Sequence, residues 1–325
     1  MNSPSFSAPA VTLAPMAGIT DPVFRRICFA FGCDGAVTEM VSAQGFLTAP
    51  KDRAAYRFLL DRFPEEGPLA VQIFGSDPLL MGQAAARLSD MGRFNAIDIN
   101  MGCPAQKVVG GGSGSALMKN EALAGRIVEA VKKSTLLPVT VKMRLGWDEE
   151  HKNAVSFART LERAGTDGLT VHGRTRMQQY AGKADWDLIG EVKAAVSIPV
   201  IANGDVTDGQ SAQNCLRATG CDGLAVGRGA LGRPWVFEEI HAALRHAPFT
   251  PPAYAQIVNT AMDQARAMAA WKGERSALLE MRKHFAWYTF GRRGAARVRT
   301  QINQAASFEE VEALLRTLGD DDGEE

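Results

Sequence analysis

Two charged or titratable side chains end short apolar runs of the sequence, and their types suit the binding of an anion. Lys142 ends the run VTVK, and an ammonium group at the end of a buried strand is almost never left unpaired. It either holds a ligand that develops negative charge or pairs with an acid of a neighbouring strand. His172 ends the run LTVH. It either contacts a ligand or is a core histidine that is hydrogen bonded within the protein.

Two glycine-containing segments indicate where a phosphate group would bind. Asn203-Gly204-Asp205 and Gly227-Arg228 each follow a short apolar run. Glycine lets backbone amides approach phosphate oxygens closely, and an arginine neutralises their charge. The pattern predicts a phosphate site, with tight-turn glycines as the alternative.

Cys103 is placed where a thiol could do chemistry. It lies in Asn100-Met101-Gly102-Cys103-Pro104, after an apolar run and before a glycine-rich stretch at residues 110–114. A thiol with an ordinary pKa of about 8.5 is protonated at neutral pH and can act as a general acid. The glycine-rich stretch lacks the complete dinucleotide-binding fingerprint, so we expect a flexible lid of about fifteen residues. The other cysteines are expected to be small buried hydrophobic residues, at positions 28, 33, 215 and 221.

Eight short runs that are rich in apolar and β-branched residues would position these candidate residues. Such continuously apolar runs are typical of strands buried on both faces of a parallel sheet. Amphipathic helical patterns lie between them, for example at residues 121–133, 153–164 and 185–195. The runs are at residues 11–18, 35–41, 68–75, 96–102, 139–146, 168–174, 199–206 and 223–229.

A repeated turn joins helix to strand in this pattern. Residues 32–35, 165–168 and 220–223 all read Gly-x-Asp-Gly, and glycine ends a helix in the left-handed conformation. The eight units recur about every 27 residues over residues 11–229, which matches a (β/α)8 barrel, an α/β fold of about 250 residues. A doubly wound open sheet is the alternative, but no run reads as an edge strand. We therefore predict a TIM barrel.

In such barrels the functional site lies at the C-terminal ends of the strands. The residues at these positions are therefore predicted to meet at one opening. They are Pro15, Met16, Ala17, Glu39, Gln72, Asn100, Cys103, Lys142, His172, Arg174, Asn203, Gly204, Asp205, Gly227 and Arg228.

The pattern changes to helices alone after Arg233-Pro234-Trp235. Helical spacing recurs at residues 253–271 and 276–290, and Ser307-Phe308-Glu309-Glu310 forms a capping box for a last helix. We predict a barrel domain at residues 1–245, a small all-helical domain at 246–319 and an acidic disordered tail at 320–325.

Composition excludes several classes of protein. The chain has 325 residues, of which 46% are hydrophobic, so it can form a sizeable core. It has no apolar run of about 18 residues and no basic secretory leader. Its five cysteines are scattered without metal-ligand spacing, which argues against disulfides and a zinc site. We expect a cytoplasmic monomer without a metal or a membrane anchor.

Charge is distributed unevenly, although the net charge of the chain is zero. Residues 245–318 contain 11 basic and six acidic side chains, an excess of five positive charges, while the last six residues add five acids. The positive segment indicates either a polyanionic partner or merely a solvated helix face.

At these residues the sequence resembles a known family, the bacterial tRNA-dihydrouridine synthases, and most closely the B type. The likeness extends from about residue 11 to residue 318, including the segment that begins MRKHFAWYTF at Met281. The matching segments are Ala14-Pro15-Met16-Ala17-Gly18, Asn100-Met101-Gly102-Cys103-Pro104, Val139-Thr140-Val141-Lys142, Val171-His172-Gly173-Arg174-Thr175, Ala202-Asn203-Gly204-Asp205 and Val226-Gly227-Arg228-Gly229.

The resemblance implies an FMN-dependent enzyme that uses NADPH to reduce a uridine in tRNA to 5,6-dihydrouridine. Hydride would pass from flavin N5 to uracil C6, while Cys103 protonates C5 from the opposite face. Lys142 would lie beside the N1/C2 side of the flavin, and His172 would contact the cofactor. Asn100 and Arg174 would contact the uracil. Pro15, Met16, Ala17 and Gln72 would hold the flavin ring, and Asn203, Gly204, Asp205, Gly227 and Arg228 would bind its phosphate.

Under this resemblance, the positive segment would bind the RNA backbone. A base stacked inside RNA cannot reach the mouth of a barrel, so it must be extruded. A basic helical domain can recognise the folded RNA by shape and charge. The candidate residues are Arg282, Lys283, Arg292, Arg293, Arg297 and Arg299.

Two other functions fit part of the pattern. A flavin barrel that acts on a small molecule, such as a dihydroorotate-type dehydrogenase, shares the phosphate site and the lysine. It gives no role to the basic segment, and binding of tRNA would separate the two functions. A non-catalytic RNA-binding or regulatory protein on a barrel would purify without the yellow colour of a flavin.

Overall fold

The strands of the chain form a closed parallel barrel. The computed structural model describes residues 9–49 and 54–319, and its strands follow the order β2-β1-β9-β8-β7-β6-β5-β4-β3, with a further pairing of β2 and β4 that closes the ring. Closure excludes the open sheet, and the predicted TIM barrel is confirmed. The strands are β1 (Ala10–Leu13), β2 (Gly35–Val37), β3 (Val41–Ser42), β4 (Leu69–Phe74), β5 (Ala96–Met101), β6 (Val139–Met143), β7 (Gly168–His172), β8 (Val200–Asn203) and β9 (Gly223–Val226).

The second predicted strand, residues 35–41, is interrupted. β2 and β3 are separate short strands that both pair with β4. Glu39 lies in the interruption, and its carboxylate accepts a hydrogen bond from the backbone N–H of Gly18. Glu39 therefore supports the loop that follows β1.

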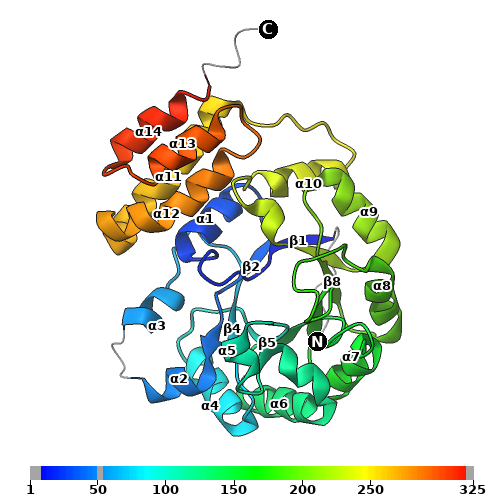
Figure 1. The fold of residues 1–325 in the computed structure, drawn as a ribbon. Coiled ribbons are helices and arrows are strands. Elements are labelled where there is room, and N and C mark those ends of the chain that lie inside the picture. Colours follow the sequence, from blue (N-terminus) through cyan, green and yellow to red (C-terminus); the bar gives the residue numbers. More distant parts are fainter. Residues whose placement is uncertain (1–8, 50–53, 320–325) are drawn as a thin grey trace.

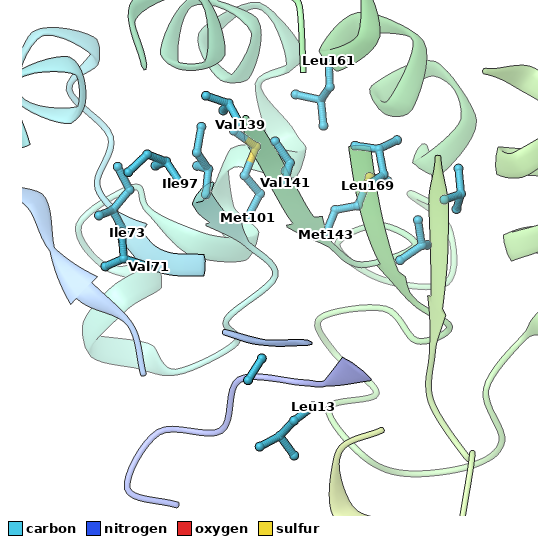
Figure 2. Close-up of a cluster of buried hydrophobic side chains, with 14 of the residues drawn as sticks. Leu13, Val71, Ile73, Ile97, Met101, Val139, Val141, Met143, Leu161 and Leu169 are labelled. Atoms are coloured by element: carbon cyan, nitrogen blue, oxygen red, sulfur yellow. The ribbon is translucent and has the colours of Figure 1, made fainter. Parts of the chain in front are cut away.

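Alternate residues of the strands serve different layers. Val71, Ile97 and Val141 belong to one buried apolar cluster, which also includes Leu161 of a surrounding helix; Figure 2 shows these side chains between strands and helix. The intervening residues of the same strands include polar side chains that bond to one another across the sheet, as Gln72 and Thr140 do to Asp98. The barrel therefore packs its helices with one set of side chains and builds its site from the other.

Helices surround the barrel and connect its strands (Figure 1). Asn120 caps one of them, because its side-chain oxygen accepts a hydrogen bond from the backbone N–H of Leu123 at 3.0 Å. The barrel helices are α1 (Pro22–Ala30), α2 (Ala43–Thr48), α3 (Ala54–Leu59), α4 (Pro78–Ser89), α5 (Gln106–Val109), α6 (Glu121–Ser134), α7 (Ala154–Arg163), α8 (Trp186–Ala195), α9 (Gly209–Thr219) and α10 (Val236–Leu244), with short 3-10 helices η1 (Gly114–Lys119) and η2 (Arg228–Ala230).

The chain ends in four helices that pack beside α1 (Figure 1). They are α11 (Tyr254–Lys272), α12 (Glu274–Tyr288), α13 (Ala295–Ile302) and α14 (Phe308–Arg316). Their apolar side chains form a second buried cluster, which takes in Val23 and Ile27 of α1 and Trp235. The exact domain boundary after residue 245 stays a prediction, and the acidic tail at 320–325 lies outside the described residues.

The segment after Cys103, which we predicted as a flexible lid, is built from helical turns. α5 and η1 occupy most of it, and the hydroxyl of Ser76 donates a hydrogen bond to the carbonyl of Gly111 at 2.8 Å. Among the described helices, none combines the length and the apolar character needed to cross a bilayer.

Candidate active site

Nearly all of the predicted site residues line one cavity at the C-terminal ends of the strands. Its volume is about 920 Å³, at the upper end of the range of about 300–1,000 Å³ that is usual for ligand sites. The predicted residues on its wall are Pro15, Met16, Ala17, Gln72, Asn100, Cys103, Lys142, His172, Asn203, Gly204, Asp205, Gly227 and Arg228.

Lys142 presents its ammonium group to this cavity. Its Nζ donates to Oδ1 of Asn203 at 3.0 Å, and the Asn203 amide is oriented by its own bond to the carbonyl of Ala225 at 2.7 Å. In the described part of the chain Lys142 has no salt bridge, but Asp98 of the neighbouring strand β5 interacts with it electrostatically and favours its charged form. Burial, assisted by the nearby Arg144, lowers the pKa of Lys142 to about 8. A bound anion would therefore find a cation whose charge it stabilises.

His172 is a neutral group on the same wall. Burial lowers its pKa strongly, and the cations Lys142 and Arg144 lower it further. No hydrogen bond to either ring nitrogen occurs within the described ranges, and the ring lies 6.2 Å from that of Tyr180, centroid to centroid. The alternative that His172 is a core histidine hydrogen bonded within the protein is therefore not supported.

The glycine segments form an open end of the cavity. Gly204 has a φ of 118°, and a Cβ added there would lie 3.0 Å from Ala184 and 3.1 Å from His172. A side chain is therefore excluded at this position. Arg228, at the start of η2, is exposed, and its guanidinium carbon lies 4.7 Å from the centre of the Tyr180 ring. This end combines accessible backbone with an exposed cation, whose Nη2 lies 3.9 Å from Oδ1 of Asp205. A phosphate site requires both features.

Arg174 does not reach the cavity, in contrast to our expectation that it contacts the substrate. Its buried guanidinium donates to both carboxylate oxygens of Asp205 at 2.8 Å and to the carbonyls of Ala181 and Gly182. The Asp205 carboxylate also accepts from the backbone N–H of Ala184 at 2.6 Å. Arg174 thus neutralises an acid that would otherwise repel an anion at the cavity.

Two arginines that sequence reasoning missed do line the cavity. Arg144 donates to the carbonyls of Gly102, Thr175 and Gln179 at 2.8–2.9 Å, and burial lowers its pKa to about 10. Arg176 also lines the wall, stacked at 4.6 Å on the ring of Trp147. The spacing of Arg144 could have indicated this position. It follows Lys142 by two residues, and in an extended chain the side chains of residues i and i+2 point to the same side.

Cys103 differs from the other cysteines as expected. It is partly exposed at the cavity, whereas Cys28, Cys33, Cys215 and Cys221 are buried. The backbone N–H groups of Gly102 and Cys103 donate to Oδ1 of Asn100 at 3.1 and 2.8 Å, and Ser115 donates to the carbonyl of Cys103. Hydrogen bonds on both sides of Cys103 therefore hold its backbone in place.

The predicted RNA-contacting residues lie on α12, α13 and the loop between them. Arg293 and Arg297 are exposed, and Arg292 lies 4.2 Å over the ring of Tyr254. Arg282 has a buried Nε without a hydrogen-bond partner in the structure. Lys283 reaches the barrel instead, where its Nζ donates to the carbonyl of Gly18 at 2.5 Å. Arg299, on α13, is half-buried.

Comparison with known proteins agrees with this site. The family model for dihydrouridine synthase (Dus) matches residues 12–320. A probable tRNA-dihydrouridine synthase of Rhodobacter capsulatus is 45% identical over 311 residues, covering 95% of this chain and 94% of its own. The tRNA-dihydrouridine synthase B of Xanthomonas campestris is 41% identical over 314 residues, with 96% and 93% covered. That of Pseudomonas aeruginosa is 41% identical over 293 residues, with 90% and 87% covered.

A solved structure, the histamine dehydrogenase of Rhizobium sp. 4-9, shares the fold. Its TM-score is 0.55 at 14% identity, and the match covers 79% of this chain and 49% of that one. At this identity the likeness shows the fold alone. The family match spans almost the whole chain, so this protein belongs to the dihydrouridine synthase family of flavin-dependent oxidoreductases.

Proposed function

We propose that the chain reduces a uridine of tRNA to 5,6-dihydrouridine, with FMN as cofactor and NADPH as reductant. The observation that carries the proposal is that one cavity joins a buried lysine, a glycine-bordered end with an exposed arginine, and the partly exposed thiol of Cys103. The relatives named above are described as acting on tRNA. The compartment that fits such a substrate is the cytoplasm.

The residues present fit a flavin mononucleotide. Among the described residues Lys142 makes no salt bridge, and the exposed Arg228 lines the same cavity as the side-chain-free backbone at Gly204. Pro15, Met16, Ala17 and Gln72 would hold the ring, Lys142 and His172 would contact it, and Asn203, Gly204, Asp205, Gly227 and Arg228 would hold the phosphate. Asp205 would contribute backbone rather than its carboxylate, because Arg174 occupies both oxygens. When bound, the flavin supplies the hydride that adds to C6 of the uracil.

Cys103 would supply the proton that completes the reaction at C5. Addition across the double bond places enolate charge beside C5, so a positioned acid is required rather than a nucleophile. Lys142 and Arg144 both interact electrostatically with Cys103, so they stabilise the thiolate that remains. Arg144 and Asn100 line the same cavity and are the side chains we propose for the uracil, in place of Arg174.

The positively charged residues of the C-terminal helices would bind the tRNA backbone. These are Arg282, Arg292, Arg293, Arg297 and Arg299, with Lys283 assigned to the contact between the helices and the barrel. A small-molecule dehydrogenase would give this charge no role.

The test is to incubate the purified protein and NADPH with tRNA that lacks modifications and to measure dihydrouridine by mass spectrometry of the digested RNA. We expect a gain of two hydrogens in uridine-containing fragments, and a yellow protein. A colourless protein, or a yellow one that oxidises NADPH without altering the RNA, would contradict the proposal.

A further inference from the structure

A continuous chain of hydrogen bonds runs from the interior of the barrel to the backbone of Cys103. The hydroxyl of Thr140 donates to Oδ1 of Asp98 at 2.6 Å, and Nε2 of Gln72 donates to Oδ2 at 2.7 Å. Nδ2 of Asn100 donates to Oε1 of Gln72 at 2.8 Å. Oδ1 of Asn100 accepts the backbone N–H groups of Gly102 and Cys103.

The direction of this chain is determined by its two ends. Backbone N–H groups can only donate, so Asn100 must turn its oxygen toward Cys103 and its nitrogen toward Gln72. Gln72 must then turn its oxygen toward Asn100 and its nitrogen toward Asp98. An ionised carboxylate can only accept, so Asp98 completes the order, and neither amide can be flipped without breaking a bond at one end.

The direction of these hydrogen bonds determines which groups the cavity wall can offer to a ligand. Gln72 and Asn100 both line the cavity, whereas Asp98 and Thr140 do not. Each amide nitrogen carries two hydrogens, of which the chain uses one. The remaining hydrogen of Asn100 has only a weak contact, with Sδ of Met40 at 3.8 Å. At Gln72 and Asn100 the wall therefore offers N–H donors, because the amide oxygens of both residues are already hydrogen bonded, and this favours ligand atoms that accept hydrogen bonds.

We propose that Asp98 is a positioning residue that sets the hydrogen-bond polarity of the cavity wall, so that Gln72 and Asn100 present N–H donors to the flavin and the pyrimidine. The inference rests on the proposed function for the identity of these ligands. Their carbonyl oxygens and unprotonated ring nitrogens are acceptors of the kind such a wall selects. Asp98 is 2% exposed and acts through Gln72 without touching a ligand.

The test compares three substitutions in the full chain, of which Asp98→Asn and Thr140→Val nearly preserve the volume of the side chain. Asp98→Leu removes the acceptor, while Asp98→Asn keeps an oxygen that can face Gln72 as its amide nitrogen turns to the hydroxyl of Thr140. Thr140→Val is the matched control, because it removes the other bond to Asp98 and leaves the bond to Gln72. FMN affinity is measured by fluorescence titration of the apoprotein, and hydrogen exchange of the Gly102 and Cys103 amides by mass spectrometry.

We expect Asp98→Leu to raise the Kd for FMN about tenfold, the effect of weakening two hydrogen bonds, and to speed exchange of the two amides. Asp98→Asn and Thr140→Val should stay within about twofold of the wild type. Circular dichroism establishes that each variant is folded. A folded Asp98→Leu protein with unchanged affinity and exchange would overturn the proposal.

The asparagine variant decides the matter if the leucine variant does not fold. Asp98→Asn is nearly isosteric, and a tenfold loss of FMN affinity in it would show that negative charge rather than acceptor polarity matters. Exchange in the apoprotein also keeps the two proposals separate. If the wild type makes no dihydrouridine, the proposed function fails, while the exchange of Gly102 and Cys103 still tests the role of Asp98.

Discussion

The cavity and the C-terminal helices both carry lysine and arginine, but they hold these cations in opposite ways. Lys142 and Arg144 are largely buried and bonded to neutral oxygens of the chain, so they keep their charge at defined positions. Arg293 and Arg297 are exposed, and no carboxylate pairs with either in the described structure. Buried charge acts strongly over short distances, whereas exposed charge attracts a polyanion from further away and is screened by salt. We therefore expect the buried cations to serve the reaction in the cavity and the exposed cations to serve tRNA binding, which we call capture.

Removal of the thiol should have the largest effect and should leave capture intact. Cys103→Ala is expected to lower dihydrouridine formation by about 10²–10⁴-fold, the usual contribution of a positioned acid. FMN binding, reduction by NADPH and tRNA affinity should be unchanged, because the substitution leaves Lys142, Arg228 and the basic residues of the C-terminal helices in place. Single-turnover assays with reduced enzyme measure the loss. Full activity would remove Cys103 from the mechanism.

Removal of the buried cation should weaken binding of the cofactor. Lys142→Met is expected to raise the Kd for FMN by about 10–100-fold, since a hydrogen-bonded charge is lost from a buried site. Lys132→Met is the matched control, because Lys132 pairs with Asp167 away from the cavity. Fluorescence titration measures both. Equal affinities in the two variants would contradict the assignment of Lys142.

The pH dependence of FMN binding provides a second test of the role of Lys142. The pKa of Lys142 is lowered to about 8, so above that pH the amine is largely neutral, and an anionic ligand should restore its proton. At about pH 9 we expect FMN binding to take up as much as one proton per chain. Calorimetry in two buffers of different ionisation enthalpy measures the uptake. The Lys142→Met protein should show none, and equal uptake in both proteins would assign the proton elsewhere.

Removal of the exposed cations should affect tRNA binding alone, and the size of the effect should depend on the salt concentration. Substituting Arg293 and Arg297 by glutamine is expected to raise the Kd for tRNA several-fold and to lower the salt slope by about 0.7–0.9 for each residue that contacts a phosphate. Arg266 and Arg316, which pair with Glu312, provide the matched double variant. If that control changed the slope as much, mere net charge would explain binding.

An effect on stability rather than on binding is expected at the junction of the two regions, where Asp21 caps α1 through the backbone N–H of Phe24 at 3.0 Å. Burial raises the pKa of Asp21 from 3.8 to about 6. The folded chain therefore binds this proton more tightly, and its contribution to the free energy of unfolding falls as pH rises from about 4 to about 6, by at most roughly 3 kcal/mol. Asp21→Asn should remove that part of the dependence. Urea unfolding at both pH values measures it, and parallel profiles would contradict the assignment.

Much of the barrel was predictable from local patterns. The apolar runs marked the strands, and the glycines at 32, 165 and 220 adopt the positive φ values of 82°, 95° and 61° that the repeated turn required. The interruption of the second strand was not predicted, because Thr38 and Glu39 do not break the apolar run strongly enough to separate β2 from β3. The turns of α5 and η1 were also missed, since glycine masked their helical character.

Residue types and spacing in the sequence were enough to identify the strands, the helix caps and the set of polar residues that face one opening. These follow from interactions between near neighbours along the chain, which a linear pattern records. Tertiary structure alone decided that Arg174 serves Asp205 while Arg144 faces the cavity, and that Asp98 orders Gln72 and Asn100. Such assignments depend on which side chains meet across different strands, because a hydrogen bond needs its partner within about 3 Å and sequence distance carries no measure of that.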